Sequence, residues 1–105
     1  DKRAKLAIEI FVHKIKKYIG SFSAVMGGVD AIVWTAGTGE NRADIREYVM
    51  KDFAFIGVDF DFDANKNFER GKVCKISKEG SKVAVYIIPT DEELMIAKAT
   101  VQFVK

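Results

Sequence analysis

A chain of 105 residues has the length of one domain, and 49% hydrophobic residues allow it to bury a core without disulfides or a structural metal. Seventeen basic and fifteen acidic residues leave a net charge of +2, too balanced for a nucleic-acid-binding protein. The single cysteine, Cys74, excludes an internal disulfide, and no apolar run reaches the roughly 18 residues that a membrane span needs. We therefore expect a single domain over 1–105, soluble and cytoplasmic, without nucleic-acid or membrane partners.

The first predicted element is a long helix that follows directly on Asp1-Lys2-Arg3 and runs to Met26. Apolar residues recur there every three or four positions, and the stripe is wide enough that we expect more than one face to be covered. Gly27 and Gly28 predict its end, because glycine is favoured just past a helix C-terminus. The apolar positions are Ile8, Phe11, Val12, Ile15, Ile19, Phe22 and Met26.

A short, continuously apolar run over 31–35 predicts a strand covered on both faces, as in a parallel sheet. The run breaks at a glycine-rich stretch, 36–41, which predicts a turn. Asn41 is the expected N-cap of a second helix, with Asp44 in its first turn. The expected inner face of that helix consists of Ile45, Tyr48, Val49 and Phe53.

The rest of the chain is less regular. Alternating Asp and Phe over 58–63 predict a half-exposed strand, 65–67 a loop, 72–77 another short strand and 83–88 a second buried strand. A last helix is expected from Asp91, with Leu94, Ala97, Val101 and Val104 on its inner face. This order predicts an α/β fold with helices on both faces of the sheet. Because only two strands look central, part of a larger sheet is expected outside the chain.

Two stretches are candidate binding sites. In Gly37-Thr38-Gly39-Glu40-Asn41, two glycines between a strand and a helix let a ligand approach the backbone, and the helix start offers N–H groups to an anion. The alternative is a tight turn capped by Asn41, which is commoner for such a short pattern. The stretch is neither a Rossmann fingerprint nor a Walker A loop, since Arg42 occupies the third glycine position and no Gly-Lys-Ser/Thr follows.

The second stretch runs from Pro89 to Glu93. Thr90 and Glu93 have the spacing of a capping box, which leaves Glu92 either as a favourable charge at a helix start or as a magnesium ligand in a cleft. Both stretches follow the carboxyl ends of buried strands, the edge at which open α/β sheets bind ligands.

Other motifs have simpler interpretations. Asp59, Asp61 and Asp63 imitate a calcium loop, but the required glycine and glutamate are missing, so we expect an exposed strand face. His13 is the only histidine, which excludes a histidine-based metal site. Cys74 has no catalytic partner in the sequence and is expected to be a small, partly buried side chain.

Taken together, five stretches in order resemble the C-terminal part of the acetokinase family, the acetate kinases. They are Arg3-Ala4-Lys5-Leu6-Ala7, Lys17-Tyr18-Ile19-Gly20, Gly27 to Val33, Thr35 to Asn41 and Ile88 to Leu94. Propionate and butyrate kinases share these motifs and remain alternatives, as does a non-catalytic binding or dimerisation module.

The resemblance implies part of a ribonuclease H-like domain of the actin, sugar kinase and Hsp70 type, with a central mixed sheet flanked by helices. It implies that the full-length enzyme transfers the γ-phosphoryl group of ATP to acetate, giving ADP and acetyl phosphate, and forms a homodimer through its C-terminal domain. Gly37, Thr38, Gly39, Glu40 and Asn41 would line the nucleotide pocket, and Glu92 would help to hold Mg²⁺. No catalytic residue of the family matches this chain, so we expect the isolated chain to be inactive.

Overall fold

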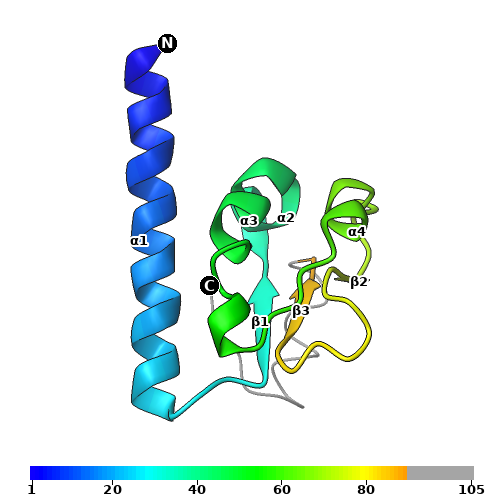
Figure 1. Cartoon of the computed structure of the whole chain (residues 1–105). Coiled ribbons are helices and arrows are strands. Elements are labelled where there is room, and N and C mark those ends of the chain that lie inside the picture. The colour runs from blue at the N-terminus through cyan, green and yellow to red at the C-terminus, as the bar shows by residue number, and fades with distance from the viewer. Residues whose placement is uncertain (90–105) are drawn as a thin grey trace.

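The computed structural model describes residues 1–89. Its elements are α1 (Lys2–Met26), β1 (Ala31–Trp34), α2 (Ala36–Asn41), α3 (Ala43–Met50), a 3₁₀ turn (Ala54–Ile56), α4 (Phe62–Lys66), β2 (Cys74–Lys75) and β3 (Ala84–Ile87). Figure 1 shows α1 as a long rod along one side, with its N-terminal turns extending past the rest of the fold. The predicted helix over 91–105 lies outside the described residues.

The described strands form one mixed sheet in the order β1-β3-β2. β1 and β3 are parallel, with Ala31 opposite Ala84 and Trp34 opposite Ile87, whereas β2 runs antiparallel to β3. The prediction of two buried strands in parallel is therefore confirmed. β3 lies in the centre, and β1 has β3 as its one strand partner among residues 1–89.

The end of α1 follows from its glycine. Gly27 adopts a left-handed conformation with φ 74°, and its N–H reaches back to Ala24 O at 3.3 Å, while the N–H of Gly28 reaches Ser23 O at 2.7 Å. These bonds satisfy carbonyls that the helix end would leave unpaired. At the other end the Asp1 carboxylate accepts the N–H of Arg3 at 3.1 Å. The sequence prediction of this helix and its stop is confirmed.

The core lies between α1, α3 and the sheet. It joins Val12 and Ile19 of α1 to the buried residues of the other elements, which include Ile32, Trp34, Ile45, Val49, Met50, Phe53, Val58, Phe60, Ile76, Val83, Val85 and Ile87. β1 is buried from Ile32 to Trp34, as expected of a strand covered on both faces. Four expected inner positions are wrong, because Tyr48 of α3 is 43% exposed and Phe11, Phe22 and Met26 of α1 are also exposed.

The predicted strand over 58–63 is wrong. Pairing there is limited to one antiparallel bridge between Phe60 and Ser77, and the helix α4 begins at Phe62. Asp61 ends the extended stretch because its carboxylate accepts the N–H of Ala64 at 3.0 Å, the bond of a helix N-cap. The predicted loop over 65–67 is wrong for the same reason, since Asn65 and Lys66 belong to α4.

Candidate functional site

The glycine-rich stretch lies where β1 ends. β1 leads into α2, and the N–H of Ile88, just after β3, donates to Trp34 O at 2.9 Å. The carboxyl ends of both parallel strands therefore meet at one edge, which Figure 1 shows beneath α2. This confirms the predicted convergence as far as Pro89. Thr90, Glu92 and Glu93 lie outside the described residues.

The stretch is more helical than predicted. Residues 36–41 form α2, but Gly37 has φ 27° and ψ −108°, far from helical values. A side chain at such a backbone conformation is strained, which explains the glycine. The stretch therefore contains a kinked helical turn rather than an irregular glycine loop.

Asn41 does not cap the next helix, so that prediction is wrong. Arg42 occupies the N-cap position of α3 without a side-chain cap. The amide of Asn41 instead donates to Gly37 O at 3.1 Å, closing α2 on itself. Asp44 lies in the first turn of α3 as predicted, and Arg42 donates to its two carboxylate oxygens at 2.9 Å each. These hydrogen bonds lower the pKa of the Asp44 carboxyl.

Gly37 and Asn41 are exposed, whereas Gly39 and Glu40 are half-buried. The ring of Trp34 lies against Gly39, since a Cβ on that glycine would be 3.5 Å from Trp34 Cε3. At Gly37 the same added atom would meet nothing within 4 Å. The stretch thus has a packed side over the strand end and an open side at Gly37, where a ligand can approach the backbone.

Sequence reasoning missed the side chain that holds this stretch from within the protein. Arg46 of α3 is completely buried, and its guanidinium donates to Gly39 O at 3.0 Å and Glu40 O at 3.1 Å. It also donates to Asn65 Oδ1 at 2.7 Å and lies 4.4 Å from the ring centre of Phe68. Burial lowers the pKa of Arg46 to about 10, which leaves the group charged at neutral pH.

Asn65 connects the other half of the network. It is fully buried in α4, and its amide donates to Ala43 O at 2.9 Å while its oxygen accepts from Arg46. α4 is therefore tied to α3 and, through Arg46, to α2. A sequence signal for Arg46 existed: the apolar residues Val49 and Met50 follow at i+3 and i+4, which places Arg46 on the buried side of the helix.

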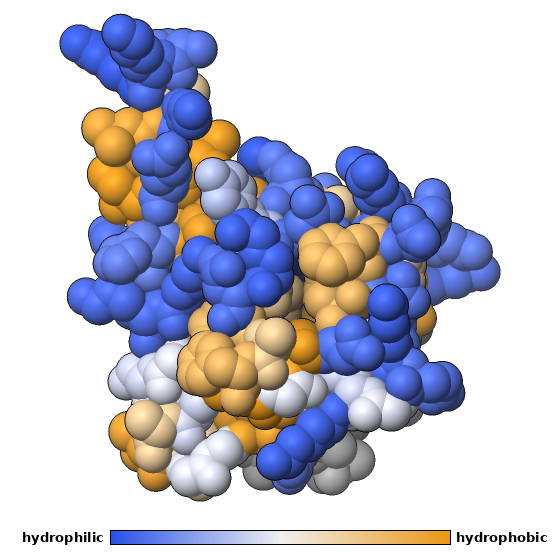
Figure 2. All heavy atoms as spheres, viewed as in Figure 1, coloured by the Kyte–Doolittle hydropathy of each residue, from blue (hydrophilic) through white to orange (hydrophobic). Residues whose placement is uncertain are grey.

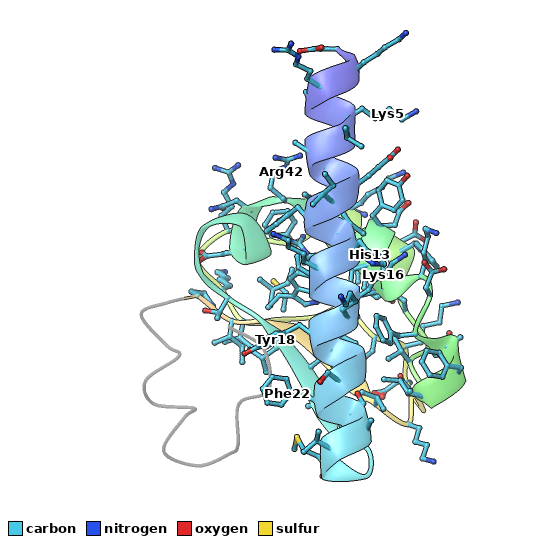
Figure 3. The ribbon with its side chains drawn as sticks, turned by 90° about the vertical axis from the view of Figure 1, so that its left-hand side faces the viewer. Lys5, His13, Lys16, Tyr18, Phe22 and Arg42 are labelled. Atoms are coloured by element: carbon cyan, nitrogen blue, oxygen red, sulfur yellow. The ribbon has the colours of Figure 1, made fainter. Side chains whose placement is uncertain are left out.

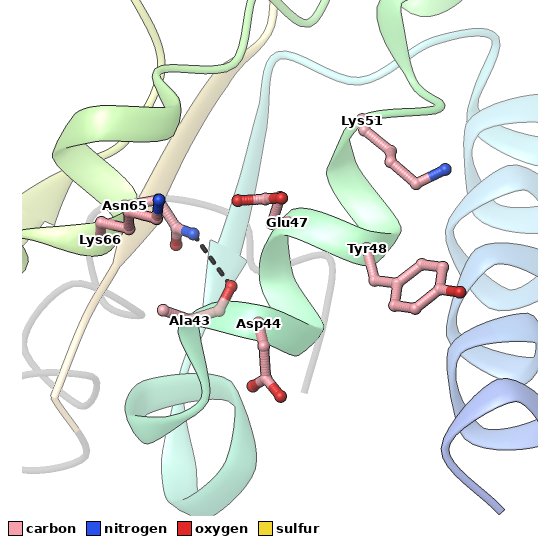
Figure 4. Close-up of a pocket in the computed structure, with 7 residues that line it drawn as sticks. All are labelled: Ala43, Asp44, Glu47, Tyr48, Lys51, Asn65 and Lys66. Atoms are coloured by element: carbon pink, nitrogen blue, oxygen red, sulfur yellow. Dashed lines mark hydrogen bonds between the residues drawn. The ribbon is translucent and has the colours of Figure 1, made fainter. Parts of the chain in front are cut away.

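A pocket of about 680 Å³ opens between α3 and α4 beside this network (Figure 4). Its lining contains two carboxylates and two ammonium groups, so their formal charges cancel and the pocket does not favour an anion. The lining residues are Ala43, Asp44, Glu47, Tyr48, Lys51, Asn65 and Lys66. Within residues 1–89 there is no cluster of three or more His, Cys, Asp or Glu side chains that could hold a metal ion.

The remaining predicted residues lie away from this edge. His13 is exposed on α1, and Figure 3 shows it beside Lys16. Cys74 is half-buried with a free thiol, as expected. The predicted exposed strand face at Asp59, Asp61 and Asp63 is wrong, because the last two begin α4. None of the helices in the described part is long and apolar enough to cross a membrane.

These observations define an α/β protein whose mixed sheet ends in a glycine-containing turn braced by a buried arginine. Residues 1–98 match the Acetokinase family, and the chain belongs to this family. An acetate kinase of Caldicellulosiruptor bescii is 53% identical over 100 residues, which are 95% of this chain and 25% of that protein. One of Halothermothrix orenii is 50% identical over 105 residues, the whole of this chain and 26% of its own length.

Solved structures give the same result. The chain resembles the acetate kinase of Porphyromonas gingivalis with a TM-score of 0.82 and 49% identity, over 95% of this chain and 25% of that one. It resembles a propionate kinase of Francisella tularensis with a TM-score of 0.72 and 40% identity, over 93% of this chain and 24% of that one. The chain spans about a quarter of the length of these relatives.

Proposed function

We propose that this chain is part of an acetate kinase that transfers the γ-phosphoryl group of ATP to acetate, giving ADP and acetyl phosphate. The observation that carries the proposal is the Gly37–Asn41 turn, at the edge where the parallel strands β1 and β3 end, in a member of the Acetokinase family. Ligands of open α/β sheets bind at that edge, near a change in strand order.

In this proposal the backbone of Gly37, Thr38, Gly39, Glu40 and Asn41 lines the nucleotide pocket. The open side at Gly37 supports this role, because an adenosine group needs close access to the main chain. Glu92, three residues past the described part, is the proposed ligand of Mg²⁺, either directly or through water. A carboxylate oxygen is the ligand type that Mg²⁺ prefers. The Mg²⁺ would accompany ATP and neutralise its phosphates.

We further propose a ribonuclease H-like fold for the domain, with residues 1–105 in the C-terminal part of the full-length enzyme, a homodimer through that part and a cytoplasmic location. The order of the five sequence motifs supports the position in the chain. A complete gene in which about three quarters of the coding sequence lies upstream of Asp1 is the expected result. If those three quarters of the coding sequence lay downstream of Lys105 instead, the proposed position would be wrong.

The isolated chain is proposed to lack kinase activity. Phosphoryl transfer requires groups that position and neutralise the phosphates from several sides. The turn at Gly37–Asn41 supplies one side only. ATP-dependent acetyl phosphate formation by the pure chain would contradict this.

The test of the main proposal is a kinase assay on the full-length protein with acetate, propionate and butyrate. We expect the highest kcat/KM with acetate. Propionate is the second candidate substrate, because the propionate kinase of Francisella tularensis shares this fold at 40% identity. A protein that phosphorylates none of the three acids would contradict the proposal and favour a non-catalytic binding module.

A binding experiment tests the nucleotide turn itself. Trp34 is the only tryptophan of the chain and lies against Gly39, so its fluorescence reports on α2. Titration of the isolated chain with Mg-ATP is expected to change this fluorescence and to shift the amide resonances of Gly37–Asn41. Shifts restricted to the pocket between α3 and α4 would place the nucleotide elsewhere.

A further inference from the structure

Arg46 is a buried cation that forms no salt bridge with any of residues 1–89. Its exposed fraction is 0%, and the described ion pairs do not include it. Its hydrogen bonds go instead to Asn65 Oδ1 and to three backbone carbonyls, those of Gly39, Glu40 and Asn65. Four charge-assisted bonds offset the cost of taking the guanidinium out of water.

The two carbonyls of Gly39 and Glu40 identify what Arg46 does locally. Both belong to the last turn of α2, where the carbonyls of a helix have no partner within the helix. A positive group there also lies at the favourable end of the helix dipole. Arg46 is therefore the C-terminal cap of α2, supplied by the following helix.

α2 depends on such a cap because it has little stability of its own. It has six residues, far fewer than an isolated helix needs in water, and two of them are glycines. The only other described side-chain bond across it is the exposed contact between Asn41 and Gly37 O. An apolar side chain would fill the volume of Arg46 but would leave the two carbonyls unpaired.

We propose that Arg46 is the positioning residue of the nucleotide turn, holding Gly37–Asn41 in its binding geometry by capping α2 from inside the protein. Asn65 supports it by fixing the guanidinium through Nε. This inference rests on the proposed nucleotide role of the turn. Arg46 itself touches no substrate: the carbonyls face inward to it, and the open side of the turn at Gly37 remains available to the ligand.

The kinetic test uses the full-length enzyme with Arg46→Met, Arg46→Lys and the control Arg42→Met. We expect Arg46→Met to raise the KM for ATP about tenfold, with a change below about threefold in the KM for acetate. Arg46→Lys keeps one donor group, so its KM for ATP is expected to lie between those of the wild type and Arg46→Met. Arg42 lies four residues earlier and is exposed, so its variant is expected to behave as wild type. Equal changes in both KM values would overturn the proposal.

Amide hydrogen exchange of the same full-length variants separates a local cap from a global loss of structure. In Arg46→Met the amides of Glu40 and Asn41 are expected to exchange faster, while those of Val85 and Ile88 in and beside β3 keep their protection. Unchanged exchange in α2, or equal loss in α2 and β3, would overturn the positioning role. If the wild-type enzyme forms no acyl phosphate, the proposed function fails, but the exchange data still decide whether Arg46 caps α2.

Discussion

Asn65 shows how a single polar residue organises the candidate site. It is the only buried asparagine in the described part, and its amide and carbonyl face two different partners, Ala43 O and Arg46 Nε. Side-chain groups of this kind are costly to bury unless each is paired. Because both partners are themselves buried or half-buried, removing Asn65 would leave a donor and an acceptor unsatisfied at once.

We expect Asn65→Ala to destabilise the chain by about 2–4 kcal/mol, since it removes two buried hydrogen bonds and one of them belongs to a cation. The matched control is Asn67→Ala. Asn67 is exposed and donates one bond to Asp63 O, so its loss is expected to stay within about 0.5 kcal/mol. Urea unfolding followed by Trp34 fluorescence measures both variants. Equal effects would mean that the network at Asn65 adds little.

The two glycines of the turn are expected to respond differently to alanine. Gly37→Ala forces a side chain into φ 27° and is expected to cost roughly 1–3 kcal/mol, although no atom lies within 4 Å of the new Cβ. Gly39→Ala places its Cβ at an ordinary 3.5 Å from Trp34 and is expected to change stability by less than about 1 kcal/mol. Thermal unfolding of the two variants compares them, and a tolerated Gly37→Ala would contradict the strain argument.

At the scale of the elements, the short helix α4 places Asn65 beside Arg46. It has five residues and depends on its cap, the bond from Ala64 N–H to the Asp61 carboxylate. We expect Asp61→Ala to cost about 1 kcal/mol. Asp59→Ala is the control, because Asp59 is exposed and contributes only backbone bonds. Denaturation of both variants tests this, and a similar loss for Asp59→Ala would point to a general charge effect.

The contact of α1 with the end of α3 carries a pH dependence. Lys16 of α1 forms an ion pair with Asp52 and donates a hydrogen bond to its carboxylate. This hydrogen bond lowers the pKa of the Asp52 carboxyl. A carboxyl with a lowered folded pKa stabilises the fold above its unfolded value of about 3.9 and loses that contribution as pH falls through the folded value.

We therefore expect Asp52→Asn to lower the melting temperature slightly at pH 7 and to have no effect well below pH 3. The effect is small because both side chains are partly exposed and water screens the pair. Melting curves at several pH values, with Asp63→Asn as an exposed control, test this prediction. A difference that grows as the pH falls would contradict the sign.

Local patterns explain how much of the elements could be predicted. Local sequence patterns predict three of the elements: the spacing of apolar residues predicts α1, and continuous apolar runs predict β1 and β3. These predictions are confirmed. The alternation of Asp and Phe over 58–63 is typical of a strand. The Asp61 carboxylate instead accepts the N–H of Ala64, so the backbone turns into the helix α4. The Arg46–Asn65 pair spans 19 residues and joins two helices, so no local period contains it.

At the scale of the whole molecule, α1 is the longest described element, and most of its residues are exposed. Figure 2 shows hydrophobic side chains gathered on it just below its hydrophilic N-terminal end. One exposed stripe has helical spacing, and Figure 3 shows two of its members, Tyr18 and Phe22, on the same side of the helix. The stripe consists of Phe11, Tyr18, Phe22 and Val25, which are 42%, 51%, 38% and 82% exposed. An exposed apolar surface of this kind favours association.

We expect the isolated chain to self-associate with rising concentration, because this stripe is left in water and β1 has one strand partner among the described residues. Light scattering over a concentration series measures the effect. Phe22→Gln combined with Val25→Gln is expected to shift the chain toward monomer. Glu9→Gln, an exposed position on the opposite side of α1, is expected to leave association unchanged. A monomer at millimolar concentration, or equal effects of the two variants, would show that the stripe does not drive association.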